Sequence, residues 1–273
     1  MKKLGFIGGG NMAEALARGL IERKLFKPAE LIVSDVDANR RRKITRTLKI
    51  ATTDDNLEVI REARAILLAV KPQQIDEVIS GVAAAKKIRL HEKLFISIAA
   101  GITIARLAGA LGAKARVIRV MPNAPAMVGR GMAALVRSKG ASKTDEAFAL
   151  KIFLAVGDAV ALKDEALLDP VTALSGSGPA YVYLFVKALA DAAASEGIPP
   201  DLAIRMALKT VEGAEYNMRT SKLAPAELIQ IVASRGGTTE AALKRFAAAG
   251  FSDIVASAVH AAADRSRELG RNF

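Results

Sequence analysis

Short apolar runs alternate with amphipathic stretches along the first 162 residues of the chain. The apolar runs are rich in Val, Ile and Leu, as in strands that are buried on both faces of a sheet. The stretches between them have the spacing of helices that pack one face on a sheet. This alternation predicts parallel βαβ units in a doubly wound sheet. The predicted strands are Lys3–Gly8, Glu30–Asp35, Ala65–Lys71, Lys93–Ala99, Ala115–Pro122, Met132–Arg137 and Ala159–Leu162. The predicted helices are Met12–Arg23, Ala38–Leu48, Gln73–Ala84, Ile104–Ala110 and Lys143–Ala155.

The pattern changes after Asp164, where strand-like runs end and long Ala- and Leu-rich stretches begin. Strands followed only by helices indicate two domains. We therefore predict an α/β domain over residues 1–164 and an all-α domain over residues 165–273. The predicted helices of the second domain are Pro179–Ala194, Asp201–Arg219, Pro225–Ala233, Thr239–Ala248 and Ser252–Leu269.

The predicted helix Pro179–Ala194 is apolar on nearly all sides, which is typical of a helix at the centre of a bundle. So small a helical domain would bury such a helix more easily with a partner chain. We therefore predict a homo-oligomer, with dimers formed through this domain. A monomer with one unusually apolar helix is the alternative.

Composition excludes several classes of protein. The chain has no Cys and only two His, so disulfide frameworks and thiolate catalysis are ruled out and a His/Cys zinc site is nearly excluded. The Lys-rich start leads directly into a glycine-rich turn, and no apolar run approaches the about 18–20 residues of a membrane span. We therefore expect a soluble, cytoplasmic protein that does not bind a membrane.

The net charge of +12 lies in the first domain, where residues 1–164 carry 29 Lys and Arg against 16 Asp and Glu. Such a basic half raises the question of nucleic-acid binding. Aromatic residues make up only 4% of the chain, however, and no nucleic-acid motif is present. An anionic small-molecule cofactor explains the charge more simply, so we expect no nucleic-acid partner.

The first predicted strand leads into Gly8-Gly9-Gly10-Asn11-Met12-Ala13, which is a Gly-x-Gly-x-x-Ala sequence followed by a helix. Gly8 allows a tight turn, Gly10 lets the backbone approach phosphates, and Ala13 lets helix and strand pack closely. Free N–H groups at the helix start face the anion. The order of strand, turn and helix predicts a Rossmann-type dinucleotide site.

The end of the second predicted strand carries conflicting indications of the cofactor. Asp35 stands where an acidic residue accepts hydrogen bonds from the ribose of NAD. Arg40, Arg41, Arg42 and Lys43 follow closely and would suit the 2′-phosphate of NADP, or form only a solvated helix face. The preference between NAD and NADP stays open.

Further segments follow strands or open helices. Lys71 follows a strand and either faces the nucleotide or lies in a plain strand-to-helix turn. Ala99–Gly101 also follows a strand, and its small residues would let the backbone approach the nicotinamide. The small-residue segments Thr172–Ala180 and Ala233–Glu240 lie beyond Asp164. In the latter, hydroxyl groups beside free helix-start N–H groups would make an anion site the size of a carboxylate. An ordinary helix cap is the alternative there.

With these motifs in order, the whole chain resembles the pyrroline-5-carboxylate reductases. The two most specific motifs are Gly176-Ser177-Gly178-Pro179-Ala180 and Gly236-Gly237-Thr238-Thr239; the others are Gly5–Ala13, Ala69–Pro72, Ser97–Gly101 and Met121–Asn123. The resemblance implies NAD(P)H-dependent reduction of L-1-pyrroline-5-carboxylate to L-proline, the last step of proline biosynthesis. It also implies a helical domain that interlocks with its dimer mate, often within decamers, and it implies no metal.

The resemblance also implies site residues. Cofactor contacts are implied for Ile7, Gly8, Gly9, Gly10, Asn11, Met12, Asp35, Asn56, Ala69, Val70, Lys71, Pro72, Ala99, Ala100 and Gly101. Substrate contacts are implied for Ser234, Gly237, Thr238 and Thr239, with Glu165 and Thr172 nearby. The chain departs from the family at Arg235, where Pro is frequent, and at Asp35, where many members have a neutral residue.

The residue inventory is consistent with this chemistry. A protonated C=N bond accepts hydride without a metal or a covalent step, so proximity of the two reactants is the main requirement. We take Thr239 as the hydroxyl that protonates the nitrogen. A β-hydroxyacid dehydrogenase is disfavoured, because Val182 stands where those enzymes have a catalytic Lys. A non-enzymatic dinucleotide-binding protein would not need the 234–239 cluster. A reductase of another cyclic imine stays open.

Overall fold

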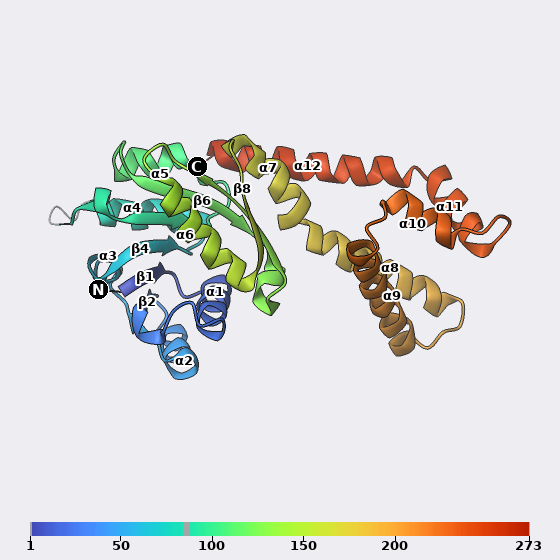
Figure 1. The fold of residues 1–273 in the computed structure, drawn as a ribbon, viewed down its shortest axis with the longest axis horizontal. Coiled ribbons are helices and arrows are strands. Elements are labelled where there is room, and N and C mark those ends of the chain that lie inside the picture. Colours follow the sequence, from blue (N-terminus) through green and yellow to red (C-terminus); the bar gives the residue numbers. More distant parts are fainter. Residues whose placement is uncertain (1, 84–87, 273) are drawn as a thin grey trace. The chain divides into compact units, whose positions relative to one another are not determined.

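The computed structural model describes residues 2–83 and 88–272, and its elements are labelled in Figure 1. The strands are β1 (Lys2–Ile7), β2 (Leu31–Ser34), β3 (Ala51–Thr53), β4 (Ala63–Leu68), β5 (Leu94–Ser97), β6 (Arg116–Pro122), β7 (Gly131–Arg137) and β8 (Gly157–Ala161). The helices are α1 (Asn11–Glu22), α2 (Ala38–Leu48), α3 (Asn56–Glu62), α4 (Ile75–Ala83), α5 (Ile104–Leu111), α6 (Lys143–Phe153), α7 (Leu168–Val171), α8 (Gly178–Ser195), α9 (Pro200–Thr220), α10 (Pro225–Val232), α11 (Thr238–Ala248) and α12 (Phe251–Asn272).

The strands form one sheet in the order β3-β2-β1-β4-β5-β6-β7-β8. β1 lies between β2 and β4 and is parallel to both, so the chain leaves β1 first toward one edge of the sheet and then toward the other. This reversal is the topological switch point at which open α/β sheets bind ligands. The Rossmann-type fold expected from the sequence is confirmed.

One step in the sheet departs from the parallel pattern. β7 is antiparallel to β6, and β8 is again parallel to β7. The connection between β6 and β7 is residues 123–130, which is too short for the crossover that a parallel pair needs. The sequence patterns did not predict this step, nor β3 and α3, because β3 has three residues and half-exposed positions.

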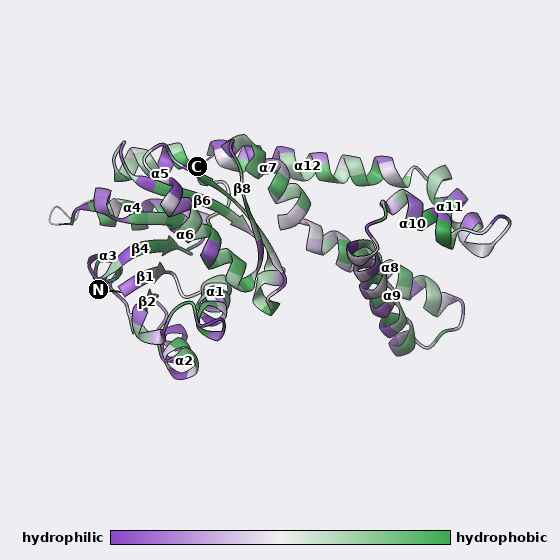
Figure 2. Cartoon of the chain, in the orientation of Figure 1, coloured by the Kyte–Doolittle hydropathy of each residue, from purple (hydrophilic) through white to green (hydrophobic). Residues whose placement is uncertain are grey.

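Alternating residues of the strands enter two separate hydrophobic cores. Leu4 and Phe6 of β1 pack with α1, α2 and α6, whereas Ile7 packs with α3, α4 and α5. Both faces of the sheet are therefore covered by helices, as expected for a doubly wound sheet. Figure 2 shows hydrophobic residues along the sheet and hydrophilic residues on the outer surface of α2.

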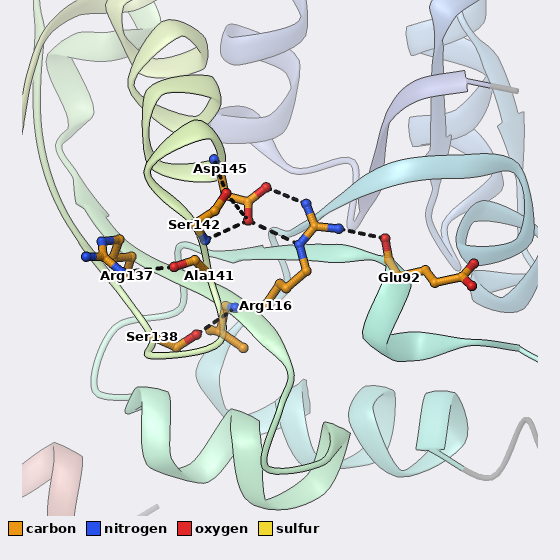
Figure 3. A network of polar contacts seen from close by, with 8 residues as sticks. Glu92, Arg116, Arg137, Ser138, Ala141, Ser142 and Asp145 are labelled. Carbon is orange, nitrogen blue, oxygen red and sulfur yellow. Dashed lines mark hydrogen bonds and ion pairs between the residues drawn. The ribbon is translucent and has the colours of Figure 1, made fainter.

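A partly buried ion pair fixes the start of β6 to α6 (Figure 3). Arg116 makes two hydrogen bonds to the carboxylate of Asp145, and its third nitrogen donates to the Glu92 carbonyl at 2.9 Å. Asp145 also accepts from the N–H and hydroxyl of Ser142, which caps α6 in return. Burial raises the pKa of Asp145, but the hydrogen bonds from Arg116 and Ser142 lower it by more, so the pKa lies below its ordinary value.

The chain divides into two compact units. The first contains the residues up to Ser177 together with those from Ala262 onward, and the second is Gly178–Ala261. The sequence pattern placed a domain boundary between residues 164 and 165 instead. The segment 165–177, which contains α7, belongs to the first compact unit because Leu168 is buried in a small core with β7 residues.

The second unit has a small core of its own. Val186 and Ala190 of α8 pack against Ala203 and Ala207 of α9. The rest of α8 is not buried in a single chain: Tyr183 is 64% exposed and other apolar residues of this helix are exposed as well. The interpretation of α8 as a fully buried central helix is therefore wrong for one chain, whereas a helix covered by a partner copy fits the observed exposure.

Helix bounds agree closely with the sequence patterns in both units. The predicted helix Gln73–Ala84 instead begins as a 3₁₀ turn at Pro72, becomes α4 at Ile75, and is described only to Ala83, so Ala84 lies outside the described residues. Among the described residues, no single helix has the length and hydropathy of a membrane span; only α11 and α12 taken together, bent by 51°, pass on length and composition.

Candidate active site

A cleft of about 510 Å³ opens at the switch point, beside the carboxyl ends of β1, β2 and β4. It is lined from β1 by the glycine-rich turn, from β2 by Ser34 and Asp35, and from β4 by Ala69 and Val70. Its full lining is Gly8, Gly10, Ser34, Asp35, Val36, Asp54, Asp55, Asn56, Leu57, Ala69, Val70, Lys71, Gln74, Glu77, Val78, Gly81 and Val82.

The glycine-rich turn is closely packed at its first two positions, and only the first of these, Gly8, is strictly required to be glycine. Gly8 has φ +96°, and a Cβ there would lie 2.8 Å from the main-chain carbon and oxygen of Ala69. A Cβ on Gly9 would lie 2.8 Å from Ile44 Cδ1 and 3.2 Å from Asp35 Oδ2. The turn is therefore pressed against β4 on one side and against Asp35 on the other.

Gly10 faces open space, because a Cβ on it would have no neighbour within 4 Å. It directly precedes α1, whose first N–H groups have no partners within the helix. A narrow Cβ-free cradle at a helix start is the donor set that a pyrophosphate needs. The residues present therefore fit a dinucleotide.

The carboxylate of Asp35 is held rigidly at the end of β2. Its Oδ2 accepts from the Gly9 N–H at 2.7 Å, and its Oδ1 accepts from the Asp37 N–H at 2.8 Å. Next to it, the Ser34 hydroxyl donates to Asn56 Oδ1 at 2.6 Å. These contacts fix two polar side chains on the wall of the cleft.

Several basic residues surround a buried carboxylate, that of Glu14, in the first turn of α1. Glu14 accepts from Lys43 at 2.7 Å and from Arg18 at 3.0 Å, and Arg40 lies 3.6 Å away. Burial raises the pKa of Glu14, but Lys43 and Arg18 lower it by more. Arg40 also donates to Asn11 Oδ1 at 2.6 Å. The start of α2 is thereby tied to the start of α1.

The structure brings together some of the residues for which the sequence predicted a cofactor contact, and not others. Gly8, Gly10, Asp35, Asn56, Ala69, Val70 and Lys71 all line the cleft. Ile7, Gly9, Asn11, Met12, Pro72, Ala99, Ala100 and Gly101 do not. Gly101 has φ +76°, and a Cβ on it would meet the Leu269 and Gly270 backbone of α12 at 3.4–3.5 Å, so it also serves packing.

Sequence reasoning missed the acidic residues of this cleft. Asp54, Asp55 and Glu77 line it beside Asp35, and Asp55 also caps α3 through the Leu57 N–H. Asp54 and Asp55 follow β3, the strand that the hydrophobic pattern did not reveal. The Asp-Asp pair ahead of a short helix was the one available indication.

The carboxylate of Glu165 accepts hydrogen bonds from other residues of the protein. Its Oε1 accepts from the Ile104 N–H at 2.8 Å and from Arg119 at 2.7 Å. Arg119 is a buried residue of β6. Glu165 therefore anchors the start of α5 and neutralises a buried guanidinium.

Thr172 begins a one-turn π-helix, Thr172–Gly176, ahead of α8. Its hydroxyl donates to the Leu168 carbonyl at 2.7 Å. Asn123 holds this wide turn from the end of β6, because its amide donates to the Ser175 carbonyl at 3.0 Å and accepts from the Met132 N–H at 2.8 Å. Such π-turns are frequent at functional sites.

The remaining predicted substrate residues lie together in the second unit, at the start of α11. Gly236 has φ +73°, and Gly237 precedes the helix with its N–H bonded to the Ser234 carbonyl at 3.0 Å. A Cβ on Gly237 would lie 2.5 Å from Ser234 Oγ. Thr238 and Thr239 form the first turn, and no side chain caps it. Glu240 accepts from the Gly236 N–H at 2.6 Å.

No group of three or more His, Asp or Glu residues within the described parts of the chain is arranged to hold a metal ion.

Comparison with known proteins places both parts of the chain. Residues 165–269 match the family model described as pyrroline-5-carboxylate reductase dimerisation, and residues 3–101 match that described as NADP oxidoreductase, coenzyme F420-dependent. The chain is 41% identical over 271 residues to the pyrroline-5-carboxylate reductase of Pseudomonas aeruginosa, covering 99% of this chain and 98% of the relative.

Solved structures agree with the sequence comparison. A pyrroline-5-carboxylate reductase from Coxiella burnetii has a TM-score of 0.91 at 32% identity, with 98% of each chain covered. A pyrroline carboxylate reductase from Plasmodium falciparum with NADP bound has a TM-score of 0.87 at 31% identity, again with 98% of each chain covered.

Proposed function

The chain belongs to the pyrroline-5-carboxylate reductase family, and on that premise we propose that it reduces L-1-pyrroline-5-carboxylate to L-proline, the last step of proline biosynthesis, with NAD(P)H as cofactor. The observation that carries this proposal is similarity over the full length of the chain, which includes both the dinucleotide cleft and the loop at the start of α11. The enzyme is an oxidoreductase that acts on a C–N bond.

The glycine-rich turn and the walls of the cleft orient the cofactor. NAD(P)H supplies a hydride to the ring carbon of the C=N bond when it is bound. The N–H groups at the start of α1, beside Gly10, would hold its pyrophosphate, and Asp35 and Asn56 would hold its adenosine ribose. Ile7, Gly8, Gly9, Asn11 and Met12 form this turn, and Ala69–Pro72 and Ala99–Gly101 complete the proposed binding surface.

In our proposal the substrate carboxylate binds at the start of α11, beside Gly237, to the main-chain N–H group of Thr238 and to the hydroxyl of Ser234. Two observations support this: the first turn of α11 has no side-chain cap, and Ser234 Oγ lies so close to Gly237 that a Cβ there would be 2.5 Å from it. Thr239 then donates a proton to the ring nitrogen, directly or through water, and its hydroxyl takes up a proton from solvent in return. Glu165 and Thr172, which the sequence placed near the substrate, act by positioning α5 and the π-turn.

Kinetics of Thr239 variants test the proton assignment. Thr239→Val removes the hydroxyl and is expected to lower kcat/KM by roughly 10²–10⁴-fold, the usual contribution of a general acid. Thr239→Ser keeps a hydroxyl and should retain most activity. Thr47→Val, on the exposed face of α2, is a matched control. Full kcat/KM in Thr239→Val would remove Thr239 from the mechanism and leave the reaction itself untouched.

The helical region forms the homo-oligomer. Its match to a dimerisation domain and the exposed apolar residues of α8 support this assembly. We further propose that residues 1–164 bind the cofactor and that residues 165–273 bind the substrate and form the dimer. We also propose that dimers associate into decamers. The enzyme is proposed to be cytoplasmic, without nucleic-acid or membrane partners. Sedimentation equilibrium tests the assembly: a sole 28.8 kDa species at micromolar concentration contradicts it.

A further inference from the structure

Building on the proposed function, we infer that this reductase prefers NADH to NADPH, because Asp35 binds the adenosine ribose and its carboxylate excludes a 2′-phosphate. The sequence left this preference open between Asp35 and the basic residues 40–43. The structure separates the two, because it shows which of these side chains reach the cleft.

The carboxylate of Asp35 lines the cleft and acts there as a hydrogen-bond acceptor. The Gly9 and Asp37 N–H groups each bind one oxygen of its carboxylate, so the side chain is fixed in place. A carboxylate offers about four lone-pair directions, so each oxygen can still accept from a ribose hydroxyl. Oδ2 already lies 2.7 Å from the Gly9 nitrogen, so the carboxylate cannot move toward the turn to make room for another anion.

The charge of the cleft is unfavourable for a phosphate near the end of β2. Of the lining residues that the structure describes, Asp35, Asp54, Asp55 and Glu77 carry carboxylates and Lys71 carries an ammonium group. None of these described lining residues is an Arg. A phosphate monoester carries about −1.5 to −2 charges at neutral pH and would be repelled by these carboxylates.

The arginines that favoured NADP are engaged elsewhere. Arg40 donates to Asn11 and lies beside the buried carboxylate of Glu14, which also holds Lys43. Arg42 donates to Asn39 within its own helix. These contacts occupy the basic side chains that would otherwise neutralise a 2′-phosphate.

Arg41 has a structural role at the same strand end. It donates to the main-chain carbonyl of Asp35 at 2.7 Å and to that of Val36 at 3.2 Å, and it pairs with Asp54 at 3.4 Å. Instead of opening a phosphate pocket, this arginine stabilises the backbone that presents Asp35. Specificity for NADH therefore comes from repulsion of the 2′-phosphate of NADPH as well as from hydrogen bonds to the ribose hydroxyls of NADH.

Direct binding measurements on the full-length protein test the inference. The chain has no Trp, so the fluorescence of the reduced nicotinamide itself reports binding of NADH and of NADPH. We expect the wild type to bind NADH at least 10-fold more tightly. Asp35→Asn removes the charge but still accepts from Gly9, and should shift the ratio of the two Kd values toward NADPH by at least 10-fold. Asp35→Ser should shift it further.

Controls separate this inference from loss of fold and from the proposed function. Asp158→Asn removes an exposed carboxylate from β8, at the opposite edge of the sheet, and should leave both Kd values unchanged. Thermal melting shows whether each variant is folded. Equal or tighter binding of NADPH by the wild type, or an unchanged ratio in folded Asp35→Asn, overturns the inference. The Kd values are measured without substrate, so they test the cofactor preference independently. A lack of turnover of pyrroline-5-carboxylate would overturn only the proposed function.

Discussion

Two glycines of the dinucleotide turn, Gly8 and Gly10, should separate effects on stability from effects on binding when each is replaced by Ala. At Gly8 the new residue would be held at φ +96°, and its Cβ would lie 2.8 Å from main-chain atoms of Ala69. At Gly10 the backbone has φ −64° and ψ 179°, which any residue adopts, and the Cβ would meet nothing in the protein. Gly8→Ala therefore strains the fold, and Gly10→Ala obstructs only the ligand.

The magnitudes follow from these two environments. Left-handed backbone costs a residue with a Cβ about 1–2 kcal/mol, and overpacking about 1–3 kcal/mol, so Gly8→Ala should lose roughly 2–5 kcal/mol of unfolding free energy. For a unit of this size that corresponds to a fall in Tm of roughly 4–20 °C. Gly10→Ala should change the unfolding free energy by less than about 1 kcal/mol.

Thermal melting with and without cofactor measures both effects. Saturation at 100 times Kd stabilises a folded protein by about 2.7 kcal/mol, so the wild type should melt at a higher temperature with NADH. Gly10→Ala should keep the wild-type Tm without NADH but lose most of the NADH-dependent rise, with Kd raised at least 10-fold. A wild-type response to NADH in Gly10→Ala, or a wild-type Tm in Gly8→Ala, would refute the reasoning.

Three further predictions concern the framework around the site. Because the pKa of Asp145 is lowered in the folded state, its ion pair with Arg116 stabilises the fold above about pH 4, and this stabilisation is lost as the pH falls through the folded-state pKa. Denaturant titrations from pH 7 to 3 should show the unfolding free energy decline. Asp145→Asn should have a lower unfolding free energy that changes less with pH. Glu165→Gln should lower Tm because Arg119 loses its charged partner, whereas a raised KM at unchanged Tm would instead favour direct contact with the substrate. Leu184→Glu, at a position 68% exposed in a single chain, should dissociate the oligomer into folded 28.8 kDa chains, and an unchanged mass would place the interface elsewhere.

The fold follows from the sequence wherever a segment has a strong pattern. Buried strands such as β1 and β4 and long helices such as α9 have continuous apolar runs or helical spacing, so their positions are predictable. β3 is not, because three residues at a sheet edge with half-exposed side chains carry no distinctive pattern. The antiparallel β7 is set by the length of a connection, which matters only once the neighbouring strand is known.

The candidate site was predictable at the glycine-rich turn and less so at its walls. Gly8 and Gly10 are identified by motif, but whether Arg40 reaches the cleft depends on Glu14, whose burial is a property of the folded structure. The role of Glu165 likewise depends on Arg119, which is 46 residues away in the chain. Such pairings are invisible to local patterns because they arise from packing.

Transfer of an isotopic label tests the central claim most directly. The purified chain is incubated with L-1-pyrroline-5-carboxylate and NADH or NADPH carrying deuterium at the transferable position of C4, and the product is analysed by mass spectrometry. The account predicts L-proline with one deuterium at the carbon of the former C=N bond, formed with at least one of the two cofactors. Absence of proline with both cofactors, or proline without the label, would contradict it.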